Sequence, residues 1–308
     1  MSESNAPVSG ALEGSNANRG LWSSRLAFIL AATGSAVGLG NIWKFPYITG
    51  ENGGGAFVLV YLLCIAAVGL PIMMAEVLIG RRGGRSPVNS LRAITGHDKL
   101  NPAWRMVGAV GVIAGFLILS FYSVIGGWAA SYVGTAASGE LTGQSADAIG
   151  AIFSDLLADP LTLLMWHTLF MALVMLVVAK GVRAGLERAV SILMPALFLL
   201  LLTVVGYAMT TGEFGRAVTF LFQPDFSKLT TTGVLVALGH AFFTLSLGMA
   251  VMMAYGSYLP KDISIAKTSI AVSVIDTGVA LLAGLAIFPI VFANGLEPGA
   301  GPGLIFQT

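Results

Sequence analysis

Charged side chains are scarce in this chain, and their scarcity bounds the class of protein. Asp, Glu, Lys and Arg make up 10% of the 308 residues, whereas about 25% is usual for a soluble globular domain. Hydrophobic residues instead make up 56%. This composition excludes an ordinary soluble domain and is typical of an integral membrane protein in contact with a lipid bilayer.

Cysteine, excess positive charge and catalytic patterns are also lacking. The single cysteine, Cys64, lies in an apolar run, which excludes an internal disulfide and favours a packing role. A formal net charge of +1 provides no basic face, so we expect no nucleic acid partner. The sequence has no paired-carboxylate, Ser–His–Asp or metal-ligand spacing, and its three histidines are scattered. We therefore expect that the chain is not an enzyme.

Long apolar segments are abundant, and a segment of about 20 such residues can cross a bilayer. Seven segments qualify, with approximate limits 22–49, 55–80, 105–136, 161–180, 186–211, 230–258 and 264–293. Residues 1–18 are rich in Ser, Asn, Gly and Ala and have no apolar core. They predict a disordered cytoplasmic tail and not a signal peptide.

The basic residues predict how these spans are oriented. Thirteen of the 16 Lys and Arg residues fall on one side of the seven spans, and only Lys44, Arg216 and Lys228 fall on the other. The positive-inside rule then places the N-terminus in the cytoplasm. The loop 138–160, which carries four acidic residues, falls outside, as the alternation of the spans requires.

Two of the spans carry glycines and polar residues at their centres. These are Thr33, Gly34, Ser35, Gly38, Gly40 and Asn41 in the first span, and Thr244, Ser246 and Gly248 in the sixth. Backbone polar groups at membrane depth must be paired or must line a cavity, so a broken helix predicts something bound at the break. Two broken helices in corresponding positions indicate the binding site of a secondary transporter. A glycine-rich face for helix packing is the alternative.

The five-span separation of the two breaks predicts an inverted repeat. If residues 22–211 form one unit of five helices, a unit that begins near residue 230 starts from the opposite side of the membrane. Residues 230–308 contain only two spans of that second unit. We therefore expect one transporter domain over 19–308, truncated after span seven.

Five stretches of the chain resemble the neurotransmitter:sodium symporter family, in particular its bacterial amino-acid transporters. They are RGLWSSRLAFILAATGSAVGLGNIWKFPY (19–47), ENGGGAF (51–57), GLPIMMAEVLIGRRGG (69–84), FYSVIGGW (121–128) and FFTLSLGMAVMMAYGSYL (242–259). The resemblance implies an all-α membrane fold of inverted five-helix repeats with discontinuous spans one and six. It also implies sodium-coupled symport of neutral, hydrophobic amino acids by alternating access, in a multi-pass protein of a bacterial inner membrane.

The resemblance also implies the residues of the site. Substrate contacts would come from Ser35, Ala36, Gly38, Leu39, Gly40, Ile118, Tyr122, Phe243, Thr244, Ser246 and Met249. Sodium ligands would come from Gly34, Ala36, Val37, Asn41, Thr244 and Asp276. In this scheme the substrate carboxylate meets the first break and Tyr122, Phe243 lies over the substrate as a lid, and Ile118 and Met249 line an apolar pocket. Met249 could otherwise be ordinary core.

Three positions of this chain refine what the resemblance implies. Gly38 stands where monoamine transporters of the family have an aspartate, which favours an amino acid with its own carboxylate. Asp276 matches an asparagine that ligates sodium, and its charge would replace a bound chloride, so no chloride is expected. His240 replaces a glutamine of chloride-dependent relatives. A protonated Asp276 and a His240 that only packs are the alternatives.

Four further residues match positions that support or gate the pathway. Glu76 would hold the unwound part of span six, Lys44 matches the outer gate, and Arg19 and Trp22 match the inner gate. A terminal arginine can equally serve as a positive-inside anchor. Two functions other than transport stay open: a non-transporting amino-acid sensor or scaffold on the same fold, and an inactive fragment of a transporter. The substrate, the sodium stoichiometry, the oligomeric state and any proton coupling by His240 are not specified by the sequence.

Overall fold

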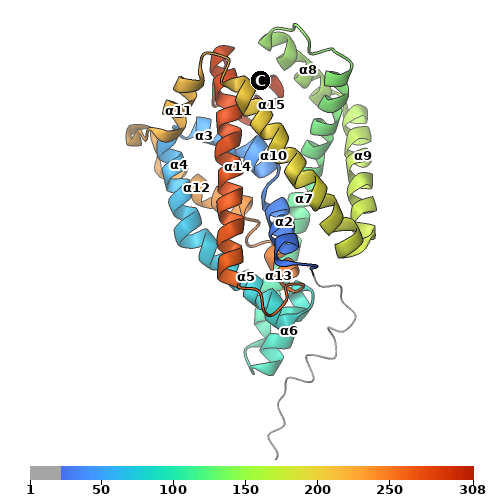
Figure 1. Cartoon of the computed structure of the whole chain (residues 1–308). Coiled ribbons are helices and arrows are strands. Elements are labelled where there is room, and N and C mark those ends of the chain that lie inside the picture. The colour runs from blue at the N-terminus through green and yellow to red at the C-terminus, as the bar shows by residue number, and fades with distance from the viewer. Residues whose placement is uncertain (1–21) are drawn as a thin grey trace, which may run out of the picture.

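The computed structural model describes residues 22–308, and within this range the chain forms helices joined by loops, with no strand (Figure 1). The predicted tail and the gate residue Arg19 lie outside the described residues. The α-helices are α2 Arg25–Ala36, α3 Phe45–Glu51, α4 Gly55–Cys64, α5 Leu70–Gly83, α6 Pro87–His97, α7 Arg105–Ala137, α8 Ala146–Ala158, α9 Pro160–Ala179, α10 Arg188–Ala208, α11 Phe214–Phe222, α12 Thr231–Thr244, α13 Val251–Gly256, α14 Ile265–Ala293 and α15 Leu304–Gln307. The predicted all-α class is confirmed.

Five of the predicted spans are helices long and apolar enough to cross a membrane. They are Gly55–Gly83, Pro102–Ala137, Pro160–Ala179, Ala184–Ala208 and Ile265–Ala293. Within Gly55–Gly83, α4 and α5 are joined by the π-helical turn η2 Ile65–Gly69. The 33-residue α7 is about 50 Å long at 1.5 Å per residue, so it exceeds a hydrocarbon core of about 30 Å.

The first and sixth predicted spans are both interrupted. The first consists of α2 and the pair η1 Gly40–Lys44 and α3, with a bend of 44° at the break. The sixth consists of the short helices α12 and α13, separated by the non-helical residues 245–250. The prediction of two discontinuous spans is therefore confirmed.

Helix α14 lies at the centre of the molecule. This central position explains why the helix is apolar on all sides. It packs against α2, α5, α10 and α11, and Figure 1 shows it running the length of the bundle. The side chains of Phe288 and Val291 are fully buried. Helix α9, by contrast, packs along α7 at the edge of the bundle and has no buried residue. Its apolar surface is that of a helix that faces lipid.

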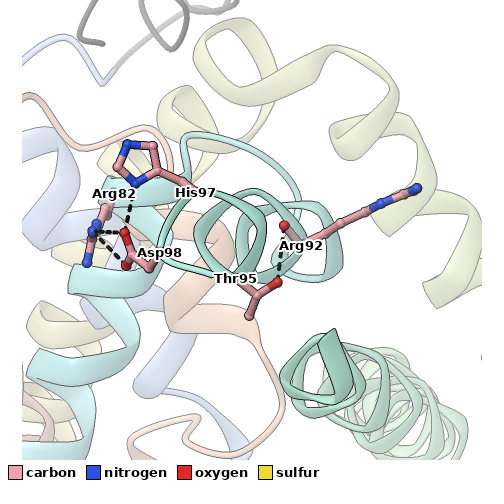
Figure 2. A network of polar contacts seen from close by, with 5 residues as sticks. All are labelled: Arg82, Arg92, Thr95, His97 and Asp98. Atoms are coloured by element: carbon pink, nitrogen blue, oxygen red, sulfur yellow. Dashed lines mark hydrogen bonds and ion pairs between the residues drawn. The ribbon is translucent and has the colours of Figure 1, made fainter. Parts of the chain in front are cut away.

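A charged corner joins α5 to α6 at the end of the molecule where the cytoplasmic loops are predicted (Figure 2). Arg82 and Asp98 form an ion pair of 2.8 Å, and Nδ1 of His97 lies 2.8 Å from Oδ1 of Asp98. The hydrogen bond with His97, together with Arg82, lowers the pKa of Asp98 below its usual value. In the same figure, the Arg92 side chain points away from this pair, and its carbonyl accepts from Thr95.

The chain after α14 folds back over the opposite end of the bundle. The Trp43 indole Nε1 donates to the carbonyl of Pro302 at 2.7 Å. The rings of Phe153 and Phe306 stack with centroids 5.0 Å apart. A β-carbon on Gly50 would lie within the backbone of Pro298, so this loop contacts α3 directly. These contacts cover the predicted outer end of the first span.

Candidate functional site

The break in the first span begins where α2 ends. Val37 takes an extended conformation (φ −73°, ψ 113°), which stops the helix after Ala36. The backbone N–H of Gly38 then donates to Oδ1 of Asn41 at 3.1 Å, and the π-helical turn η1 continues the chain. Because the last turn of a helix leaves carbonyl groups without partners, the end of α2 presents acceptors to the centre of the bundle.

The break in the sixth span is a segment of alternating left-handed residues. Ser246, Gly248 and Ala250 have φ angles of 56°, 76° and 60°, which are incompatible with a continuous right-handed helix. The N–H of Gly248 is freed by the break and donates to Oε1 of Glu76 at 2.7 Å. The buried carboxylate of Glu76 on α5 therefore occupies the position expected of a residue that holds the unwound segment, although its role in function stays a prediction.

The two breaks meet α14 at a buried polar cluster made of Asn41, Thr244 and Asp276. Asn41 Nδ2 donates to Oδ1 of Asp276 at 2.8 Å and to the Asp276 carbonyl at 2.9 Å. The Thr244 hydroxyl lies 3.0 and 3.1 Å from the two carboxylate oxygens. All three side chains are 0% exposed. The structure thus brings together three residues predicted to bind sodium from η1, α12 and α14.

The carboxylate of Asp276 has no basic partner in the part of the chain that the structure describes. The ion pairs found there involve other residues, and Asp276 receives hydrogen bonds from the neutral groups of Asn41 and Thr244 alone. A buried ionised carboxylate needs a compensating cation. Amide, hydroxyl and carboxylate oxygens are the ligands that hard cations prefer. The residue types of the cluster therefore fit a small alkali or alkaline-earth cation, although Asn41 turns its amide nitrogen to Asp276 while its Oδ1 accepts from the Gly38 N–H.

A cavity of about 280 Å³ lies next to this cluster, between the two breaks and α7. Its size is just below the range of about 300–1,000 Å³ that is usual for small-molecule sites. The Tyr122 hydroxyl accepts from the N–H of Gly40 at 3.3 Å. A β-carbon on Gly38 would lie 3.0 Å from the same hydroxyl, so a side chain at this position would press on Tyr122. The Ser246 hydroxyl donates to the Ser35 carbonyl at 3.0 Å and links the two breaks.

Most of the predicted substrate residues line this cavity. They are Ser35, Ala36, Gly40, Ile118, Tyr122, Phe243, Ser246 and Met249. Of the others, Gly38 lies beside the Tyr122 hydroxyl, Thr244 belongs to the buried polar cluster, and Leu39 packs near Trp43. The cavity also includes Gly115, Leu119 and Val251, which the sequence analysis missed. Gly115 lies seven residues before Tyr122 on α7, and that helical spacing could have revealed it.

The remaining predicted sodium ligands, Gly34 and Val37, lie on the side of the break that faces α10. A β-carbon on Gly34 would lie 2.7 Å from Cγ1 of Val190, and Val37 is buried among apolar residues. A second sodium site at their carbonyl groups stays a prediction.

Two of the predicted gate residues, Lys44 and Trp22, lie among the described residues. The Lys44 Nζ lies 4.1 Å from the centre of the Phe243 ring, so its charge rests on the aromatic residue that borders the cavity. At the other end, Trp22 is buried, and its indole Nε1 donates to the carbonyl of Tyr255 at 3.2 Å. These contacts attach the start of α2 to α13. Their role as gates stays a prediction.

His240 is a buried group whose role the structure leaves unassigned. Its ring is stacked 5.9 Å from Phe45 and lies 5.1 Å from the ring of Tyr61. Neither ring nitrogen has a hydrogen-bond partner among the residues that the structure describes. The stacking accords with a packing role for His240.

The comparisons with known proteins define first the class and then the family. The crystal structure of MhsT in complex with L-phenylalanine matches with a TM-score of 0.87 and 47% sequence identity, covering 94% of this chain and 65% of that chain. The fold is therefore that of a multi-pass membrane transporter and not that of an enzyme. The profile of the Sodium:neurotransmitter symporter family matches residues 19–149 and 144–296. The chain belongs to this family.

Relatives found by sequence similarity agree with this assignment. The sodium-dependent transporter YhdH of Bacillus subtilis (strain 168) is 46% identical, over 93% of this chain and 63% of the relative. A sodium-dependent transporter of Haemophilus influenzae is 38% identical, over 95% of this chain and 65% of the relative. The human sodium- and chloride-dependent taurine transporter is 28% identical, over 96% of this chain and 54% of the relative. The chain thus spans less than two thirds of the length of each of these proteins.

Proposed function

We propose that the protein carrying this sequence is a sodium-coupled symporter of neutral, hydrophobic amino acids that works by alternating access. One observation carries the proposal: within residues 22–308 the buried carboxylate of Asp276 lacks a cationic partner, and it lies among oxygen-bearing side chains from both broken spans. A sodium ion at this cluster would neutralise the charge, and its binding would join the two breaks.

The amino acid would bind in the adjacent cavity. Its carboxylate would approach the backbone of Gly38 and Gly40 at the start of η1 and the hydroxyl of Tyr122, because the start of a helix favours anions. Its side chain would lie against Ile118 and Met249. The phenylalanine bound to the similar protein MhsT supports a hydrophobic amino acid.

Binding of sodium and binding of the amino acid would be coupled, because the two sites are adjacent. Asn41 and Thr244 belong to the polar cluster, whereas the adjacent residues Gly40 and Phe243 line the cavity. Each ligand would therefore stabilise the same arrangement of the two breaks, and binding of either would raise the affinity for the other by the same factor. Lys44 over Phe243 would control access from the outer side. We propose a bacterial inner membrane with a cytoplasmic N-terminus, on the basis of the 13 basic residues on that side.

We further propose that chloride is not required. Asp276 would supply a fixed negative charge within the protein, whereas the human taurine transporter, a relative, is chloride-dependent. Transport should then be unchanged when gluconate replaces chloride. A strong chloride requirement would contradict this role of Asp276.

The proposed function is tested by measuring the binding of labelled amino acids in a sodium buffer and in a choline buffer. The purified native membrane protein that carries this sequence should bind labelled leucine, phenylalanine or tryptophan in sodium, and binding should vanish when choline replaces sodium. Undiminished binding in choline would refute the sodium site, and no binding of any neutral amino acid in sodium would refute the substrate site. A non-transporting sensor would bind in the same way, so the two functions separate only in an uptake assay.

A further inference from the structure

Two glycines on α7 face the break of the sixth span and differ in how much room they leave. A β-carbon on Gly111 would lie 2.9 Å from Cβ and 3.0 Å from N of Ala250. One turn further along, a β-carbon on Gly115 would lie 3.3 Å from the Met249 carbonyl oxygen. Gly111 is buried, whereas Gly115 lines the cavity. Gly111 therefore packs closely against the break of the sixth span, whereas the space beside Gly115 is part of the cavity.

The cavity follows the face of α7 that carries Tyr122, Ile118 and Gly115. Residues four and seven positions apart lie on the same side of a helix, and seven residues span about 10 Å. The Tyr122 end is polar, because the hydroxyl bonds the backbone of Gly40. The Gly115 end is bordered by the apolar residues Met249 and Val251. The cavity therefore has a polar end and an apolar end about 10 Å apart.

We propose that Gly115 is a specificity-determining residue, and that its missing side chain admits amino acids with a bulky aromatic side chain. This inference rests on the proposed function, because it assumes that the amino acid carboxylate lies at the Tyr122 end. The aromatic ring would then extend past Ile118 and occupy the space beside Gly115. A methyl group at position 115 would fill that space from one side and would also press on the Met249 carbonyl.

The opposite wall cannot readily move away to restore the space. The N–H of Gly248 is held by Glu76 at 2.7 Å, and Ala250 rests against Gly111. Both residues have left-handed backbone conformations with φ angles of 76° and 60°, and such conformations persist where the surrounding structure holds them. A side chain added at position 115 should therefore reduce the space that is available to the substrate.

The test compares Gly115→Ala with the wild-type protein and with Gly134→Ala. Gly134 is a matched control on the same helix, where an added β-carbon would lie 3.6 Å from the Trp166 ring in ordinary contact. Sodium-dependent binding of tryptophan, phenylalanine, valine and alanine is measured by competition. Gly115→Ala should weaken tryptophan binding by about tenfold or more and leave alanine within about threefold, because one methylene in a fitted pocket changes discrimination by roughly 10- to 200-fold. Gly134→Ala should match the wild type.

The outcomes separate this inference from the proposed function. Binding of small amino acids by the wild type with rejection of tryptophan would overturn the inference while the function stood. An equal loss for all four amino acids in Gly115→Ala, or no change in their ratio, would also overturn it. If Gly115→Ala does not fold, the wild-type series alone still decides whether a bulky aromatic substrate enters. The absence of any sodium-dependent binding in the wild type would instead refute the proposed function.

Discussion

Replacement of Asp276 by asparagine tests the origin of sodium affinity, because it removes the charge and keeps the shape. The side chain would still accept from Asn41 and Thr244, whose donors lie 2.8 to 3.1 Å from the carboxylate. What disappears is the attraction between two unit charges, which is about 4 kcal/mol at 4 Å for an effective dielectric constant of about 20. Part of this is offset by the lower cost of burying a neutral amide.

We therefore expect a net loss of about 2–4 kcal/mol in sodium binding, which is a weakening by roughly 30- to 1,000-fold. In the absence of sodium the substitution should instead stabilise the protein. Asp276→Asn should then raise the melting temperature, because the wild type buries an uncompensated charge. The assay is the sodium concentration for half-maximal substrate binding, together with melting curves in sodium and in choline. Transport by the variant should be impaired and partly rescued by chloride. An unchanged sodium dependence would refute the assignment of Asp276 as the charged ligand.

Three further predictions concern single contacts. Tyr122→Phe should weaken binding of the amino acid by about 1.5–3 kcal/mol in a competition assay, because it deletes a hydrogen bond to a charged group; an unchanged affinity would place the carboxylate elsewhere. Glu76→Ala should lower the free energy of unfolding by about 1–3 kcal/mol, because the Gly248 N–H would lose its acceptor, and Glu76→Gln, which keeps an acceptor, should retain most of it in chemical denaturation. Asp98 has a lowered pKa in the folded protein, so its contribution to the α5–α6 corner is present above its unfolded pKa and is lost as the pH falls through the folded value. The hydrogen-exchange protection factors at this corner, which remove the pH dependence of the intrinsic exchange rate, should therefore fall in acid in the wild type, whereas in Asp98→Asn they should be low already at neutral pH; wild-type protection factors unaffected by acid would contradict this.

Apolar length and polar breaks were sufficient to predict the helices of the bundle and their two interruptions. A span must satisfy its own backbone groups in lipid, so its length and composition show directly in the sequence. The breaks were visible for the same reason, because Gly38, Gly40 and Ser246 would be out of place in an uninterrupted apolar helix. The small helices α6, α8, α11 and α15 were missed. They lie in loops, where neither bilayer length nor continuous apolarity marks a helix.

The site was predictable only in part. Polar residues in apolar surroundings, such as Asn41, Thr244 and Asp276, are conspicuous because burying them is costly. Gly115 was not conspicuous, since a glycine in a membrane helix usually serves helix packing. Its place in the cavity depends on the path of the segment after Thr244. That path is set by the long-range bond between Glu76 and Gly248, which no local pattern contains.

Uptake into proteoliposomes tests the central claim most directly. The native membrane protein that carries this sequence is reconstituted, and labelled phenylalanine is supplied outside with an inward sodium gradient in chloride-free buffer. The account predicts accumulation above the outside concentration, abolished by a sodium ionophore and by Asp276→Asn. Sodium-dependent binding without accumulation would contradict symport and support a sensor, and accumulation that is indifferent to the sodium gradient would contradict the role of the Asn41–Thr244–Asp276 cluster.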